Sequence, residues 1–209
     1  MLNVSRAQTY NEAMRAGVGV FLVRTVGLFL AAVLAAAPAP VFAQPTPRVV
    51  AVADFWDAST GGFHIGAERL SERLARELAS RSPAIQVVPS SEVRTAMRAR
   101  GYRPADLYSP ARASELAQTV GAHWIVTGRW THLDIQEIEV RASESAIPPP
   151  PRRVIGQAVL EIRVLDASSR RVLLEETFWA ASDGWHGLDA LWDAAERVLA
   201  LAADRIARM

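Results

Sequence analysis

Two aspartates flank an aromatic pair in the stretch VVAVADFWDASTGGFHIGAERLSERL, residues 49–74: Asp54 and Asp57 lie on either side of Phe55-Trp56. The apolar residues before them predict a buried strand, and open α/β sheets usually place ligands at the carboxyl ends of their strands. Paired carboxylates at such a place could act as acid and base in a hydrolase. Alternatively, Asp54 caps the turn and Asp57 is solvated.

The glycines of the same stretch do not form a phosphate-binding loop. A Walker loop requires G-x-x-x-x-G-K-[ST], in which the lysine meets the phosphates. Gly61 and Gly66 have the right spacing, but Ala67 and Glu68 follow them, and an acid in place of the cation would repel phosphate. The glycines at 61, 62 and 66 also fail the pattern G-x-G-x-x-G. We therefore expect no bound nucleotide.

Other catalytic and metal-binding patterns are weak. The chain has no cysteine, which excludes thiolate zinc sites and disulfides and predicts that it is not a lipoprotein. His123 and His132 could approach each other only if the chain folds back at Gly128, and no serine lies in a G-x-S-x-G setting. We expect no catalytic residue, no metal and no cofactor. The histidines are His64, His123, His132 and His186.

The chain contains six tryptophans. Trp124 and Trp192 fall on core positions of their segments. The other four lie at expected strand ends or in turns, where an exposed ring would mark a surface that binds a partner; packing in the core is the alternative for each. These candidate partner-binding residues are Trp56, Trp130, Trp179 and Trp185.

Composition limits the class of protein. Half of the residues are hydrophobic, enough for a buried core, and the formal net charge is +1. A chain so close to neutral is not expected to bind nucleic acid, because such binding depends on neutralising phosphates with basic residues.

The first 43 residues read as an extension and a secretory signal. Arg15 and Arg24 precede the apolar run Thr25–Ala37, which is shorter than the roughly 20 residues needed to cross a bilayer, and small residues follow up to Ala43. We expect cleavage after Ala43 and export to the periplasm; a retained membrane anchor is the alternative, and Met14 is an alternative start. Residues 44–209 then form one domain.

The exported part alternates strand and helix patterns. Helices between the early strands imply parallel neighbours, and the segment DASSRR joins the last two strands as an antiparallel hairpin. We predict an α/β (or α+β) fold in which helices pack on a mixed sheet. The strands are expected at 48–55, 84–88, 123–127 (continuing toward 140 after a break near Gly128), 154–166 and 172–181, and the helices at 65–81, 90–101, 109–121 and from 188.

Several of these segments resemble the CsgG-like family, whose structural relatives include the N-terminal domain of TolB and the synthase activator LpoB. The resemblance is carried by Asp54-Phe55 at a strand end, Ser90 before a helix, GAHWIVTG at 121–128 and the hairpin over 162–173. It implies an anticodon-binding-like sandwich of two or three layers and a function in binding, with no active site to carry over. Because the two loops where the pore-forming member has long hairpins are short or proline-rich, we expect no transmembrane barrel.

Three functions follow as hypotheses. The first is a non-enzymatic interaction or accessory module of the cell envelope that binds envelope proteins and can form a homo-oligomer. The second is a ligand- or glycan-sensing domain that uses Trp130 and Trp179. The third is a small periplasmic hydrolase that uses Asp54 and Asp57.

Overall fold

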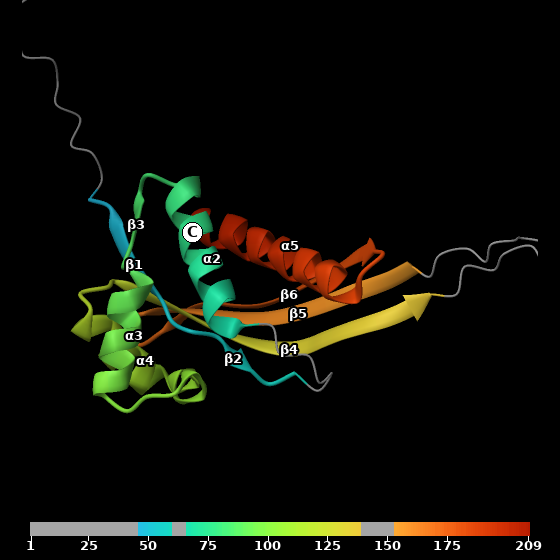
Figure 1. Cartoon of the computed structure of the whole chain (residues 1–209). Coiled ribbons are helices and arrows are strands. Elements are labelled where there is room, and N and C mark those ends of the chain that lie inside the picture. The colour runs from blue at the N-terminus through green and yellow to red at the C-terminus, as the bar shows by residue number, and fades with distance from the viewer. Residues whose placement is uncertain (1–45, 60–65, 139–152) are drawn as a thin grey trace, which may run out of the picture. The chain divides into compact units, whose positions relative to one another are not determined.

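A mixed β-sheet organises the residues that the computed structural model describes, 46–59, 66–138 and 153–209 (Figure 1). Its strands lie in the order β3-β1-β4-β5-β6, and the short β2 pairs with β4. The strands β3 and β4 run parallel to β1, whereas β4, β5 and β6 are antiparallel neighbours, which confirms the predicted mixed sheet. The strands are β1 (Arg48–Val52), β2 (Trp56–Asp57), β3 (Ile85–Val87), β4 (Trp124–Ile138), β5 (Arg153–Asp166) and β6 (Val172–Gly184).

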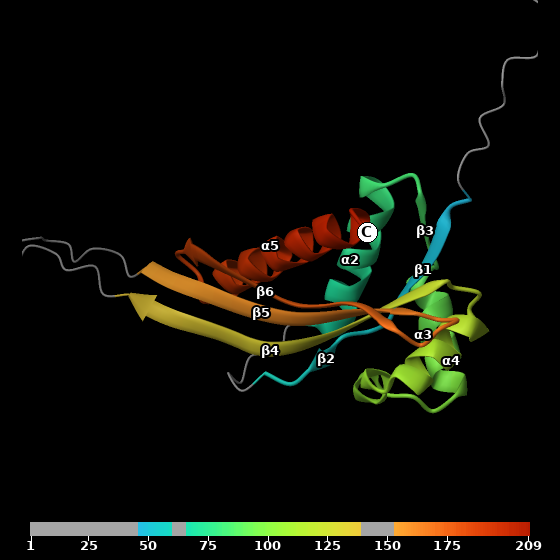
Figure 2. The same ribbon diagram turned by 180° about the vertical axis from the view of Figure 1, so that it is seen from behind.

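Helices cover the two faces of the sheet unequally. Figures 1 and 2 show α2 and α5 on one face, and α3 and α4 on the other face beside β1. Each side has its own cluster of buried residues, one around Leu74, Leu160 and Val198, the other around Val93, Leu116 and Ile125. The helices are α2 (Ala67–Arg81), α3 (Ser90–Ala99), the 3₁₀ helix η1 (Pro104–Tyr108), α4 (Pro110–Thr119) and α5 (Gly187–Ala207).

Local sequence explains several of these elements. The helix α4 begins at Pro110, directly after Ser109, and Gly121 follows it with a φ of +67°, a conformation that glycine adopts without strain. In β5 every second residue from Ala158 to Val164 is buried, and the residues between them are half-buried. Both features agree with the sequence predictions.

The expected break at Gly128 is wrong. The strand β4 continues through this residue, and its register shift lies between Trp130 and His132. Glycine is required at 128 for another reason: a Cβ there would lie 2.6 Å from Cδ1 of Phe55. The ring of Phe55 therefore occupies the space that a side chain would fill.

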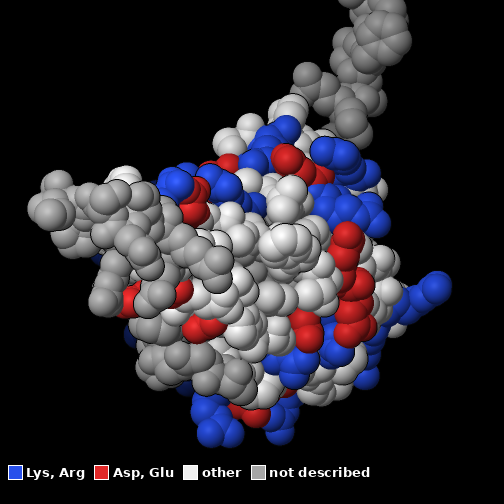
Figure 3. All heavy atoms as spheres, turned by 90° about the vertical axis from the view of Figure 1, so that its right-hand side faces the viewer, with Lys and Arg blue, Asp and Glu red and all other residues white. Residues whose placement is uncertain are grey.

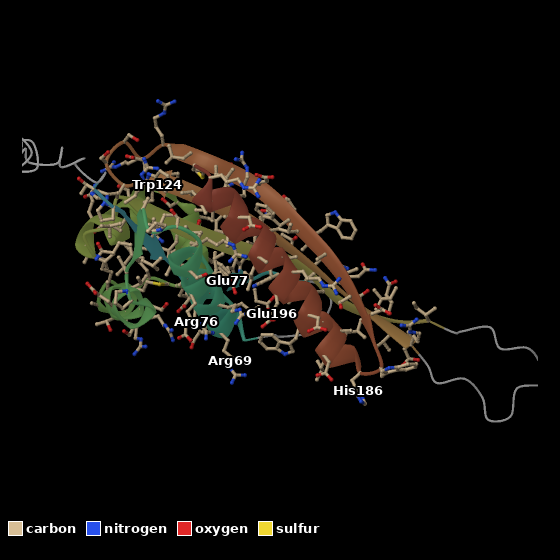
Figure 4. The ribbon with its side chains drawn as sticks, turned by 90° about the horizontal axis from the view of Figure 1, so that it is seen from above. Arg69, Arg76, Glu77, Trp124, His186 and Glu196 are labelled. Carbon is tan, nitrogen blue, oxygen red and sulfur yellow. The ribbon has the colours of Figure 1, made fainter. Side chains whose placement is uncertain are left out.

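The helix α5 lies along β5 and β6, and its first turn contacts the sheet directly. At Gly156 of β5, a Cβ would collide with the backbone of Ala190 and Leu191. In Figure 4, α5 runs from His186 across α2, where Glu77 and Glu196 approach each other. Arg73 lies 3.2 Å from Glu77 and 4.0 Å from Glu196, so it links the two helices.

The two edges of the sheet differ in length. The strand β3 has three residues, lies between Pro83 and Pro89, and forms one edge. The strand β6 has 13 residues and forms the other edge. Its pairing with β5 shifts between Val164 and Leu165, which leaves Leu173 as an extra residue near its start.

Some sequence predictions lie outside the described residues. These include the leader with its cleavage after Ala43, the alternative start at Met14, Gly61, Gly62, His64 and the proline run before Arg153. Of the helices in the described ranges, none combines the length and the apolar character that a membrane span requires.

Candidate functional site

A cavity of about 390 Å³ lies at the carboxyl end of β1, between α2 and α3. The chain leaves β1 toward α2 on one face, and reaches β4 from β3 through helices on the other face. Such a reversal of connections is where open α/β sheets form ligand crevices. The polar residues that line it are Asp54, Asp57, Glu68, Arg94, Arg98 and Tyr102.

The carboxylate of Asp54 is held by residues of its own chain. Its Oδ1 accepts a hydrogen bond of 3.0 Å from the hydroxyl of Ser71 and lies 3.7 Å from Nε of Arg94. Burial raises the pKa of Asp54, and the Ser71 hydrogen bond and the charge of Arg94 oppose this rise. Asp54 is therefore a structural partner of α2 and α3.

Arg94 connects three elements at the same point. It forms an ion pair with Glu72 and lies 3.5 Å from Glu68, both on α2, while it also approaches Asp54. The hydrogen bond to Glu72 is the main cause of a raised Arg94 pKa. This network joins the end of β1 to α2 and α3.

The second aspartate is also engaged. Oδ1 of Asp57 accepts hydrogen bonds from the backbone N–H and the hydroxyl of Ser59, at 3.1 and 2.7 Å. No histidine is among the described residues that line the cavity. His123 instead accepts a hydrogen bond at Nδ1 from the N–H of Val49. The two carboxylates thus belong to one cavity, but each serves to fix its own segment.

Metal binding finds no support in the part of the chain that the structure describes. There, His, Asp and Glu residues form no group of three or more that could hold an ion.

The four candidate tryptophans separate into three environments. Trp130 is fully buried, its ring 6.3 Å from that of Phe55, so its predicted place on a binding surface is wrong: its position in β4 directs it into the core. Trp56 is half-buried. Trp179 and Trp185 are 70% and 59% exposed. Whether they bind a partner stays a prediction.

Trp56 belongs to a cluster of arginines and aromatic rings. Its ring lies 5.9 Å from Tyr108, and the guanidinium of Arg129 lies over both rings. The guanidinium of Arg163 lies 4.7 Å from the centre of the Tyr108 ring. Burial raises the pKa of Tyr108 to about 12. Arg129 pairs with Glu161 and Arg163 with Glu175, so the charges of the cluster balance. The cluster could not be predicted from the sequence because η1 was not predicted.

Exposed apolar side chains gather along β6 and the adjacent part of α5. We call them the β6 surface. A groove of about 520 Å³ lies between residues 179–181 of β6 and the outer side of α5 near Leu201. Figure 3 views the end of the molecule where α5 begins, and shows charged side chains around an uncharged area. The members of the β6 surface are Val172, Leu173, Trp179, Trp185, Leu188 and Leu201.

Only the tryptophans of the β6 surface were predicted from the sequence to be exposed. The pattern of Val172 and Leu173 is that of any strand, and Leu201 continues the apolar pattern of α5. Their exposure follows from the edge position of β6, which depends on long-range pairing.

No family model and no curated protein matches the chain. Solved structures do match: the hypothetical protein CT253 from Chlamydia trachomatis (16% identity, 77% of this chain and 96% of that chain, TM-score 0.48), lipoprotein GNA1162 from Neisseria meningitidis (13%, 78% and 100%, 0.49) and LpoB from E. coli (15%, 68% and 60%, 0.49). LpoB is a relative named in the sequence resemblance, and none of these three is a CsgG or TolB protein. Similarity at this level assigns no function.

Proposed function

We propose that the chain is a non-enzymatic, exported protein of the cell envelope that binds another protein chain through the β6 surface. The observation that carries the proposal is the combination of a 13-residue edge strand with exposed apolar side chains along it, above all Trp179. An edge strand offers unpaired N–H and C=O groups to another chain, and a large aromatic ring is a frequent anchor of protein interfaces. The leader pattern supports export to the periplasm.

The internal contacts of Asp54 and Asp57 favour this role over hydrolysis. A general acid or base must be free to exchange a proton with substrate, whereas both carboxylates accept hydrogen bonds from neighbouring serines. The glycan-sensing alternative loses one of its two rings, because Trp130 is buried. If the protein binds a glycan through Trp179 alone, adding an envelope glycan should raise the melting temperature of the protein.

Cross-linking in intact cells tests the proposed function. The wild-type protein, the variant Trp179→Ser and the matched control Ile138→Ser are compared; Ile138 is an exposed apolar residue of β4. We expect a protein cross-link, to itself or to another envelope protein, in the wild type and the control that is lost in Trp179→Ser. Equal cross-linking in all three would refute a role for the β6 surface.

A further inference from the structure

The edge strand β6 is long, and Arg197 of α5 donates a hydrogen bond of 3.4 Å to the carbonyl oxygen of Ala181 near its far end. Short length and proline commonly prevent edge strands from pairing with another chain, but β6 has 13 residues and contains no proline. Its one irregularity, at Leu173, leaves residues 174–184 in regular pairing with β5. We propose that β6 pairs antiparallel with β6 of a second copy of this chain. The pair is centred at Thr177, which means that a two-fold axis passes there and Thr177 lies opposite Thr177 of the second copy. This rests on the proposed function and names its partner.

The acidic residues of β6 do not prevent such pairing, because each has an arginine partner in its own chain. Glu175 accepts hydrogen bonds from Arg163, and Glu176 lies 2.9 Å from Arg205. Asp183 pairs with Arg153. These ion pairs are exposed to solvent, so they weaken the repulsion between the acids of two copies without removing it.

Charge selects the register of the pair. Two-fold pairing centred at Glu175 or Glu176 places identical acids opposite each other, and pairing centred at Trp179 places Glu175 opposite Asp183. Like charges directly opposite are destabilising in a sheet.

Antiparallel pairing about a two-fold axis normal to the sheet keeps the α5 face of both copies on the same side.

Pairing centred at Thr177 avoids these contacts and adds favourable ones. It brings Asp183 beside Arg170 and Arg171 of the second copy, which precede β6 and have no ion pair among the described residues. A shift of the centre by one residue, to Phe178, would bring Asp183 to Val172 and Leu173 instead. The arginines and the aspartate thus favour a second copy in this register.

The same register gives Trp179 a place to pack. It lies opposite Glu175 of the second copy, whose carboxylate is held by Arg163. The ring would cover this ion pair, and the exposed fraction of 70% would fall. The two sheets would form one continuous sheet through the β6 strands.

Single cysteines test the register in a chain that otherwise has none. In antiparallel strands, directly opposed Cα atoms lie about 4.5–5.5 Å apart, within the range that a disulfide spans. We expect the purified, exported variant Thr177→Cys to oxidise to a covalent dimer. Glu175→Cys and Trp179→Cys should not cross-link with themselves, because each lies opposite the other residue. A mixture of the two should give a mixed dimer, because this dimer keeps one contact between Trp179 and Glu175 and the disulfide traps even a weakened pair.

A charge swap provides a test without cysteines. The double change Arg170→Asp with Arg171→Asp should raise the dimer dissociation constant, measured by sedimentation equilibrium, about tenfold. Adding Asp183→Arg should return this constant toward the wild-type value. Arg208→Asp, far from β6 in sequence and exposed, serves as a control.

The outcomes separate this proposal from the proposed function. A cross-link at 175 or 179 alone would overturn the register. A monomer at all concentrations, together with a foreign protein whose cross-link depends on Trp179, would overturn self-pairing and leave the proposed function intact. A monomer with no Trp179-dependent cross-link would overturn both.

Discussion

The two edges of the sheet, at β3 and at β6, differ in how well the rest of the chain covers them. On the β3 side, helices cover both faces, the edge strand has three residues between prolines, and Asp54 accepts a hydrogen bond from Ser71 of its own chain. On the β6 side, the described helices cover one face and the edge strand has 13 residues with exposed apolar rings. Substitutions on the first side should affect folding, and those on the second should affect association.

Trp130→Ala should cause the largest loss of stability. The ring is fully buried against Phe55, and truncation of a buried tryptophan costs about 3–5 kcal/mol. Chemical denaturation measures this loss. Trp179→Ala is the matched control and should change the free energy of unfolding by less than about 0.5 kcal/mol. Similar losses in the two variants would contradict the comparison.

Gly128→Ala should cost about 1–3 kcal/mol, because the added methyl group meets the ring of Phe55 at 2.6 Å and overpacks the core. The second change Phe55→Leu should recover part of this loss in thermal or chemical unfolding. Gly184→Ala is a milder comparison, since the nearest atom to its added Cβ lies at 3.4 Å. If Gly128→Ala is neutral, the close approach does not limit this position.

Matched lysines on the two edges should separate their roles. Thr177→Lys places a charge on the proposed axis, where the lysine lies opposite the same lysine of the second copy. It should raise the dimer dissociation constant about tenfold. Gln86→Lys makes the same change on exposed β3 and should leave it unchanged. Sedimentation equilibrium measures both. Equal effects would show that association does not depend on β6.

The smallest effect concerns pH. The pKa of Asp54 is raised by burial above its ordinary value of 3.8, so its contribution to stability is complete below that value and is lost as the pH rises through the folded-state pKa. The unfolding free energy of the wild type relative to Asp54→Asn should therefore fall with rising pH across this range. A difference that rises instead would mean that Ser71 and Arg94 outweigh burial.

Sequence patterns were sufficient where the determinants are local. Ser109, Pro110 and Gly121 set the ends of α4, and alternation in β5 identified the buried row from Ala158 to Val164. The parallel early strands and the antiparallel pair of β5 and β6 followed from the connections between elements, whereas the order of the strands was not predicted.

Local patterns failed where a distant residue decides. Trp130 looked like a ring at a strand end, but β4 continues past it and buries it against Phe55. Gly128 was interpreted as a turn because the ring that excludes a side chain lies on another segment. The open edge at β6 depends on β5 pairing with β4, so the exposure of Val172 and Leu173 could not be recognised in advance.

The missing side chain at Gly156 has a consequence for comparing relatives. Since the backbone of Ala190 and Leu191 occupies the place of a Cβ there, any other residue would force the first turn of α5 away from β5. Homologues that keep glycine at this position are expected to have inherited the same close docking of the helix, and those that lost it to have moved the start of the helix.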